Sequence, residues 1–104
     1  MTDFSFAETQ SEGIARLALS GDLDMSATFR LEPALDRLFS SGEVGELVLD
    51  LSGVDFVDSS GLGLLLTTNE RSRDTGTAMT IVGPSQEVRR VFRIAGVDGV
   101  LPLH

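Results

Sequence analysis

A hydroxyl-rich stretch, Asp-Ser-Ser-Gly-Leu-Gly beginning at Asp58, lies where the sequence changes from an apolar run to a helical pattern. The first backbone N–H groups of a helix have no partner within the helix, and Ser59 or Ser60 could accept a hydrogen bond from one of them. Asp58 lies where the positive end of the helix dipole favours a carboxylate. Gly61 and Gly63 would keep the outer surface flat, so that another molecule could approach the first turn closely.

This segment has two interpretations. In the simpler one, its residues only start a helix that packs tightly on a sheet. In the other, it is a regulated surface. A phosphate on Ser59 would add about −1.5 to −2 charges beside Asp58, and the helix N-terminus would offset part of that repulsion, by roughly 0.3–1 kcal/mol. A partner covering this spot would lose several kcal/mol, hence about a factor of 100 or more in affinity, so the modification would switch binding and leave the fold intact.

The remaining composition argues against most catalytic and metal chemistry. The chain has no Cys and no Lys, and its single His is His104. Disulfides, thiolate ligands, Schiff bases and phosphate-clamping lysines are therefore excluded, and a His at the chain end is a poor partner for a catalytic serine. We expect no enzymatic activity and no resident metal or cofactor.

The charge of the chain narrows its macromolecular partners. Sixteen acidic residues against eight basic ones leave a formal net charge of −8. Such a domain repels phosphate backbones and anionic lipid, and no apolar run approaches the roughly 20 residues of a membrane span. We therefore expect a cytoplasmic domain that binds neither nucleic acid nor membrane.

Two other acidic motifs compete weakly with the serine segment. Asp50 could be the acceptor of a phosphoreceiver domain, but that chemistry uses a Lys, which this chain lacks. The spacing of Asp22, Asp24 and Ser26 looks like the start of a calcium loop. Its sixth position would be Ala27 instead of Gly and its twelfth Pro33 instead of Glu, so the bidentate ligand is missing.

Two further features also have a functional and a structural interpretation. Gly61 and Gly63 match part of a dinucleotide-binding turn, but the third Gly of that pattern falls at Leu66. Arginines gather in two places, which we interpret as solvated faces that balance nearby acids, with docking to an acidic partner surface as the alternative. These arginines are Arg71, Arg73, Arg89, Arg90 and Arg93.

Hydrophobic periodicity places these motifs on alternating strands and helices. The expected strands cover residues 4–8, 14–19, 47–51, 78–82 and 100–103, and the expected helices begin near residues 26, 62 and 86 and end near 42, 74 and 95. We expect a loop from Ser20 to Asp24, the end of the third strand at Ser52 and Gly53, and a bend at Pro33.

The order of these elements predicts the fold class. The first two strands form a hairpin, and the strand–helix alternation after them requires right-handed crossovers onto a mostly parallel sheet. We therefore expect an α/β fold, with a mixed sheet of four to five strands and three helices packed mainly on one face. No linker or repeat divides the chain, so residues 1–104 are expected to form a single domain.

Four motifs, in this order, resemble the STAS domain of bacterial anti-sigma factor antagonists. Together they span essentially the whole chain, and the serine segment after a buried strand is the most specific of them. The motifs are Ser20-Gly-Asp-Leu-Asp24, Leu47 to Leu51, Val54-Asp-Phe-Val-Asp-Ser-Ser-Gly-Leu-Gly63 and Val91-Phe-Arg-Ile-Ala-Gly96. The family's further C-terminal helix, rich in Glu and Ala, has no counterpart here, so we expect a STAS-like fold that lacks it.

The resemblance implies a function in transcription. Proteins of this family bind an anti-sigma factor with a histidine-kinase-like ATPase fold and so free a sigma factor. The anti-sigma factor phosphorylates the antagonist on the hydroxyl residue after the motif Asp, which is Ser59 here, and a PP2C-type phosphatase restores binding. The chain would then be a monomeric substrate of its partner kinase and would need no cofactor of its own.

The resemblance also implies a docking surface around Ser59. It would combine the first turn of the second helix with the loop before the first helix, where Asp24 matches an acidic family position. The expected contacts are Asp22, Asp24, Met25, Asp58, Ser60, Gly61, Leu62 and Gly63. The alternative is a constitutive STAS scaffold or accessory subunit, which docks on an ATPase without being phosphorylated.

Overall fold

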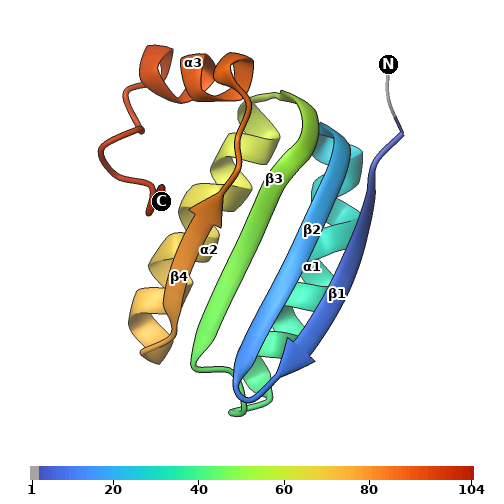
Figure 1. Cartoon of the computed structure of the whole chain (residues 1–104), viewed down its shortest axis with the longest axis vertical. Helices are drawn as coiled ribbons and strands as arrows, with labels where there is room; N and C mark the ends of the chain where they lie inside the picture. Colours follow the sequence, from blue (N-terminus) through green and yellow to red (C-terminus); the bar gives the residue numbers. More distant parts are fainter. Residues whose placement is uncertain (1–2) are drawn as a thin grey trace.

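The computed structural model describes residues 3–104, which form a layered α/β structure (Figure 1). The strands are β1 (Ser5–Ser11), β2 (Ile14–Leu23), β3 (Glu46–Val57) and β4 (Ala78–Val82), and the helices are α1 (Met25–Ser40), α2 (Ser59–Thr75) and α3 (Gln86–Ile94). No helix within these residues combines the length and the apolar character of a membrane span.

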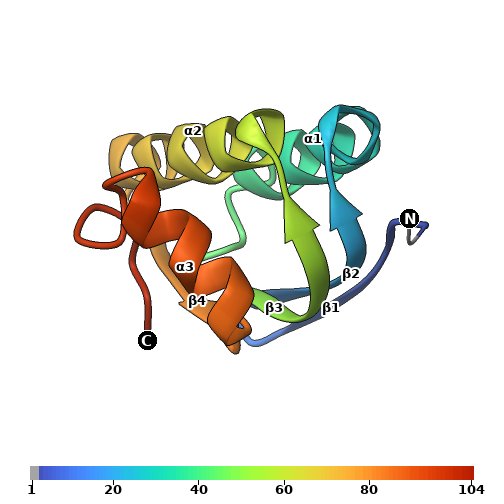
Figure 2. The same cartoon turned by 90° about the horizontal axis from the view of Figure 1, so that it is seen from above.

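The sheet is mixed, and two helices cover one of its faces. Its order is β1-β2-β3-β4, with β1 antiparallel to β2 and the β2–β3 and β3–β4 pairs parallel. Helices α1 and α2 lie side by side over one face, and α3 lies at the end of the sheet where β4 finishes (Figure 2). The expected α/β class, with a mixed sheet and three helices, is confirmed for residues 3–104.

Strands β2 and β3 are longer than the sequence predicted. The loop expected to begin at Ser20 and the strand end expected at Gly53 are wrong, because β2 continues to Leu23 and β3 to Val57. The pairing of the two strands shifts register twice near Gly21, which has a φ of 90°. A Cβ atom on Gly53 would lie 2.6 Å from the Ser20 hydroxyl oxygen and 3.0 Å from the Leu19 carbonyl oxygen, so the neighbouring strand would have to adjust. These glycines therefore permit irregular pairing within continuing strands.

The core lies between the sheet and the two covering helices. Alternate residues of β2 and β3 point toward the helices, as expected for strands with one covered face. Helix α1 adds a buried stripe and runs without interruption through Pro33, which is exposed. The fully buried leucines are Leu17, Leu19, Leu23, Leu31, Leu47, Leu49, Leu51 and Leu65.

Near the C-terminus, helix α3 matches the sequence prediction and the expected fifth strand does not. Ser85 caps α3 by accepting a backbone N–H at 3.1 Å, and Gly96 follows the helix with a φ of 74°, as predicted. The fifth strand expected near Leu103 is reduced to one parallel bridge between Leu103 and Ile81. That bridge lies along the free edge of β4.

Helix α2 comes very close to the sheet at its first turn. A Cβ atom on Gly61 would overlap the carbonyl oxygen of Leu23, whereas a Cβ on Gly63 would meet no described atom within 4 Å. Gly61 is buried and Gly63 is partly exposed. The outer surface that we expected both glycines to keep flat is therefore left open by Gly63 alone, and Gly61 allows close packing.

We predict opposite stability changes for alanine at these two positions. Gly61→Ala should lower the free energy of unfolding by about 1–3 kcal/mol, because the added methyl group forces the helix away from Leu23. Gly63→Ala, in the same helical turn, should raise it by about 0.5–1 kcal/mol through helix propensity. Urea denaturation followed by circular dichroism measures both, and equal changes in the two variants would contradict the packing role of Gly61.

Candidate functional site

The candidate site lies where α1 and α2 begin, at the carboxyl ends of two neighbouring parallel strands (Figure 1). The last pair between β2 and β3 is Leu23 with Val57, so Asp24 and Asp58 follow directly on adjacent strands. The backbone N–H of Asp58 donates to the Leu23 carbonyl oxygen at 3.3 Å. Helices α1 and α2 therefore start next to each other, where β2 and β3 end and a backbone hydrogen bond joins the two strand ends.

Each helix is capped by the aspartate that precedes it. The Asp58 Oδ1 atom accepts a hydrogen bond from the Gly61 backbone N–H at 2.9 Å, and Asp24 Oδ1 accepts from the Ala27 N–H at 3.0 Å. We expected Ser59 or Ser60 to cap α2, and this is wrong, because Asp58 has the extended backbone of an N-cap residue. The two serines are instead the first two residues inside the helix.

The capping by Asp58 leaves the Ser59 hydroxyl available. Ser59 is exposed, and within residues 3–104 its hydroxyl forms no hydrogen bond. Ser60, one position later, is only partly exposed. The arrangement therefore presents one uncommitted hydroxyl group to solvent, directly beside a helix-capping carboxylate.

The carboxylate of Asp24 is stabilised in its ionised form. The Ala27 backbone N–H and then the Ser26 hydroxyl, which donates at 2.8 Å, hold the pKa of Asp24 below its ordinary value. Both donors lie in the first turn of α1, so the lowered pKa is a direct consequence of helix capping. The site therefore carries a firmly negative group at the start of α1.

The other predicted contact residues surround these caps in different ways. Met25, the first residue of α1, is 58% exposed, and Asp22 and Leu62 are partly buried. Gly63 forms part of the open outer surface, while Gly61 lies beneath it against Leu23. Sequence reasoning thus selected this segment as a whole and did not separate its outward-facing from its inward-facing members.

The sequence analysis missed two exposed aromatic residues at this end of the molecule. Phe29 is 67% exposed and lies one helical turn after Met25, and Phe56 is 52% exposed near the end of β3. The signal was present for Phe29, because it falls outside the apolar spacing formed by Ala27 and Leu31. Exposed apolar side chains of this size beside a polar site are typical of protein-binding surfaces.

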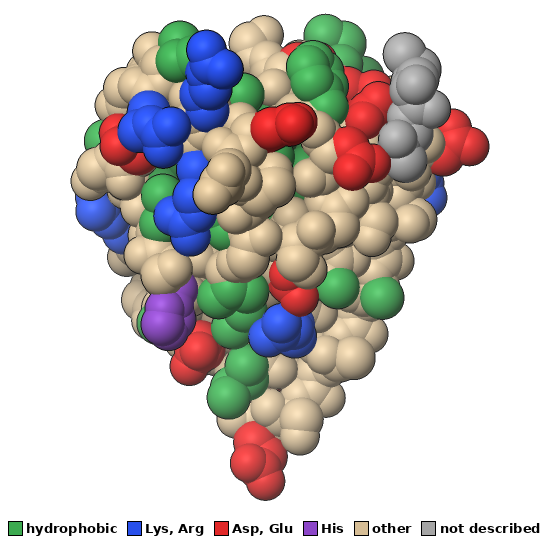
Figure 3. All heavy atoms as spheres, turned by 45° about the horizontal axis from the view of Figure 1, so that its top comes forward, with side chains coloured by type: hydrophobic (Ala, Val, Ile, Leu, Met, Phe, Trp, Pro, Cys, Tyr) green, Lys and Arg blue, Asp and Glu red, His purple; other side chains and the backbone are tan. Residues whose placement is uncertain are grey.

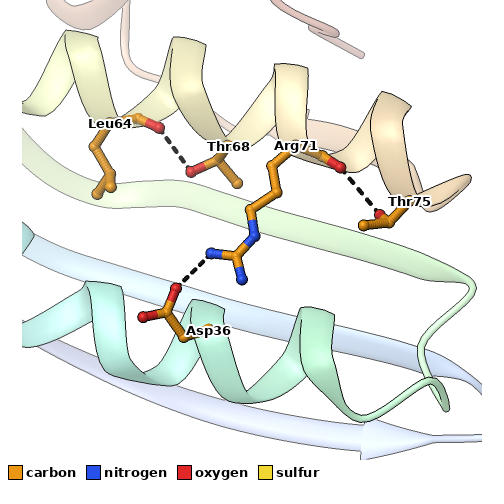
Figure 4. A network of polar contacts seen from close by, with 5 residues as sticks. All are labelled: Asp36, Leu64, Thr68, Arg71 and Thr75. Atoms are coloured by element: carbon orange, nitrogen blue, oxygen red, sulfur yellow. Dashed lines mark hydrogen bonds and ion pairs between the residues drawn. The ribbon is translucent and has the colours of Figure 1, made fainter.

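A groove of about 420 Å³ leads away from the site between α1 and α2. It begins at Ser60 and Gly63 and ends where Arg71 of α2 pairs with Asp36 of α1 (Figure 4). The Arg71 guanidinium also lies 4.9 Å from the centre of the Phe39 ring. The far end of the groove is therefore closed by a contact between the two helices.

The competing acceptor, Asp50, lies away from this end. It pairs in register with Val82 and Ala18 in the middle of the sheet and forms a 2.8 Å ion pair with Arg16. Hydrogen bonds from Ser52 and then the contact with Arg16 lower the pKa of Asp50. Asp50 therefore belongs to an ion pair on the strands, away from the exposed serine.

Comparison with known proteins adds independent information on this chain. The family model described as "Mlab, STAS domain" matches residues 6–102. The anti-sigma-F factor antagonist RsfB of Mycobacterium tuberculosis is 30% identical over 86 residues, which is 83% of this chain and 69% of that protein. This chain is thus similar, over most of its length, to an anti-sigma factor antagonist.

Solved structures agree with that similarity. The crystal structure of an anti-sigma factor antagonist from Mycobacterium paratuberculosis has a TM-score of 0.85 and 28% identity, covering 98% of this chain and 86% of its own. The Bacillus protein SpoIIAA in its phosphorylated form has the same fold, with a TM-score of 0.77 and 22% identity, covering 96% of this chain and 89% of its own. The expected STAS-like fold is therefore confirmed.

We predict that Asp24 contributes to the loss of stability in acid. Its pKa is lower in the folded chain, so the folded state holds the proton less tightly than the unfolded chain, whose pKa is about 3.9. The contribution is present above about pH 4 and is lost as the pH falls through the folded pKa. Wild type should therefore lose more of its free energy of unfolding between neutral and acidic pH than Asp24→Asn, which still caps the helix. Equal losses in urea titrations would exclude this contribution.

Proposed function

The chain belongs to the STAS domain family and, within it, to the anti-sigma factor antagonists, and from this premise we propose that it binds an anti-sigma factor and thereby frees a sigma factor for transcription. The observation that carries the proposal is the exposed and unbonded hydroxyl of Ser59, one residue after the Asp58 cap. This geometry supports a protein that is modified by its partner. The chain would be a substrate and the catalytic residues would belong to the anti-sigma factor.

The proposed partner is a serine kinase with a histidine-kinase-like ATPase fold. The Ser59 oxygen attacks the γ-phosphorus of ATP bound to the partner, so a new O–P bond forms and ADP leaves. The hydroxyl proton passes to a base of the partner. A PP2C-type phosphatase then hydrolyses the phosphoserine and returns the free hydroxyl and inorganic phosphate. Both reactions act on the first turn of α2, where the helix dipole stabilises the added charge.

The proposed docking surface consists of the exposed and partly exposed residues at the two helix starts. Its members are Asp22, Asp24, Met25, Asp58, Ser59, Ser60, Leu62 and Gly63, with Gly61 supporting them from below. A phosphate on Ser59 adds about −1.5 to −2 charges to a surface that already holds three aspartates. A partner that binds the unmodified surface would have to bury that charge, so the complex dissociates. Because the released sigma factor acts on transcription, we place the chain in the cytoplasm. We also propose that the chain acts as a monomer.

We predict that substitutions at Ser59 separate binding from modification. Ser59→Ala should bind the cognate anti-sigma factor like wild type but take up no phosphate. Ser59→Asp should bind at least about tenfold more weakly, because it carries a permanent charge at the same place. Purified anti-sigma factors of the source organism are tested by calorimetry, and intact mass after incubation with ATP counts the phosphates.

Ser60→Ala is the matched control, since it removes a neighbouring hydroxyl from the same helical turn. This variant should still gain one phosphate. Equal affinities of Ser59→Ala and Ser59→Asp would contradict the switch. Binding without any gain of phosphate in the wild-type chain would favour the constitutive scaffold instead.

A further inference from the structure

Helix α3 carries several arginines that form no ion pair with the other described residues. Three of the eight arginines pair with carboxylates, namely Arg16, Arg37 and Arg71, and Arg30 donates to the Phe4 carbonyl oxygen. The arginines without such a partner in the described part of the chain are Arg73 on α2 and Arg89, Arg90 and Arg93 on α3. In a chain of net charge −8, one nine-residue helix therefore holds three of these four cations.

The outward side of α3 combines these cations with an exposed apolar residue. Val88 and Phe92 are buried and fix the orientation of the helix. Arg90, Arg93 and Ile94 lie on the opposite side, at i, i+3 and i+4, and all three are exposed. Ile94 is 75% exposed, more than any other large apolar side chain of residues 3–104. We call Arg90, Arg93 and Ile94 the α3 stripe.

Helix α3 lies at the same end of the molecule as the starts of α1 and α2 (Figure 1). The first turn of α3 faces the last part of β3 across a cleft whose walls include Asp55 and Glu87. Strand β3 leads from there directly to Asp58. Viewed toward this end, basic side chains gather on the side of α3 and acidic side chains on the other side (Figure 3). The basic side of α3 and the acidic helix starts therefore share one end of the molecule, with the acidic cleft walls Asp55 and Glu87 at the first turn of α3.

We propose that the α3 stripe is a second contact for the anti-sigma factor, which would present an acidic segment with an apolar pocket to it. This inference rests on the proposed function and adds a contact that Ser59 does not reach. Charge complementarity supports it, because the stripe is the part of an otherwise acidic chain that attracts a carboxylate-rich surface. Arginine is also enriched among the energetically important residues of protein interfaces. An interface that includes both the docking surface and the α3 stripe would orient the partner through a negative and a positive patch.

Charge reversal on α3 tests the proposal, with Arg73→Glu as the matched control. Arg73 and Arg93 each lie in the last turn of a helix and have no carboxylate partner in the described residues, so their substitution changes the charge and the helix end in the same way. Binding rates are measured by surface plasmon resonance with the anti-sigma factor that forms the complex with Ser59→Ala. The double variant Arg90→Glu/Arg93→Glu should associate about tenfold more slowly at low salt, and Arg93→Glu about threefold more slowly.

Arg73→Glu should change the association rate by less than about twofold, and the differences should shrink as salt increases. Ile94→Ser should dissociate several-fold faster with little change in association. If wild type and Ser59→Ala bind but the α3 variants match Arg73→Glu, the second contact is excluded and the proposed function stands. If wild type binds no anti-sigma factor, the proposed function and the second contact are both excluded. Self-association that the α3 variants abolish would assign the stripe to a second copy and overturn the proposal.

Discussion

The parallel pairing of β2 with β3 determines where α1 and α2 begin relative to each other. Its last pair, Leu23 with Val57, brings the ends of two strands that are far apart in the sequence to neighbouring positions. An aspartate follows each of these residues and caps the helix that starts there. If either strand ended earlier, as the sequence pattern predicted, the two helix starts would not meet at one surface. The continuation of both strands through irregular pairing is therefore the constraint on which the site depends.

The choice of capping residue determines the chemistry that this surface can support. A serine at the N-cap would use its hydroxyl oxygen to accept a backbone hydrogen bond. Asp58 is the N-cap residue instead. Ser59 is therefore the first residue of the helix, and its side chain stays exposed. The same carboxylate lies next to the point where a phosphate would be added. Asp58 thus stabilises the start of α2 and supplies a negative charge to which the proposed phosphate would add.

The sequence predicted the fold class well and indicated the segment of the candidate site, because both follow from short-range patterns. Apolar periodicity identified the helices and the strand cores, and the cap and glycine signals defined α3 closely. The long-range features were not predictable in this way. Whether Gly53 ends a strand or allows close contact with Ser20 depends on a neighbouring strand, and the same holds for Gly61 against Leu23. Ser59 could be predicted to be near a helix start, but its freedom from capping depended on the backbone of Asp58.

The separation of acidic and basic side chains at one end of the molecule has a consequence for how successive partners are selected. Between charged surfaces, attraction extends over about 8 Å at physiological ionic strength, so a partner is oriented before it touches. The phosphate proposed for Ser59 would add charge only to the acidic side of this surface and would make the charge distribution more asymmetric. A phosphatase with a positively charged active site, as the proposed function requires, would then be attracted to the phosphorylated surface. In the proposed cycle, one phosphorylation would therefore weaken the attraction of one enzyme and strengthen that of the next.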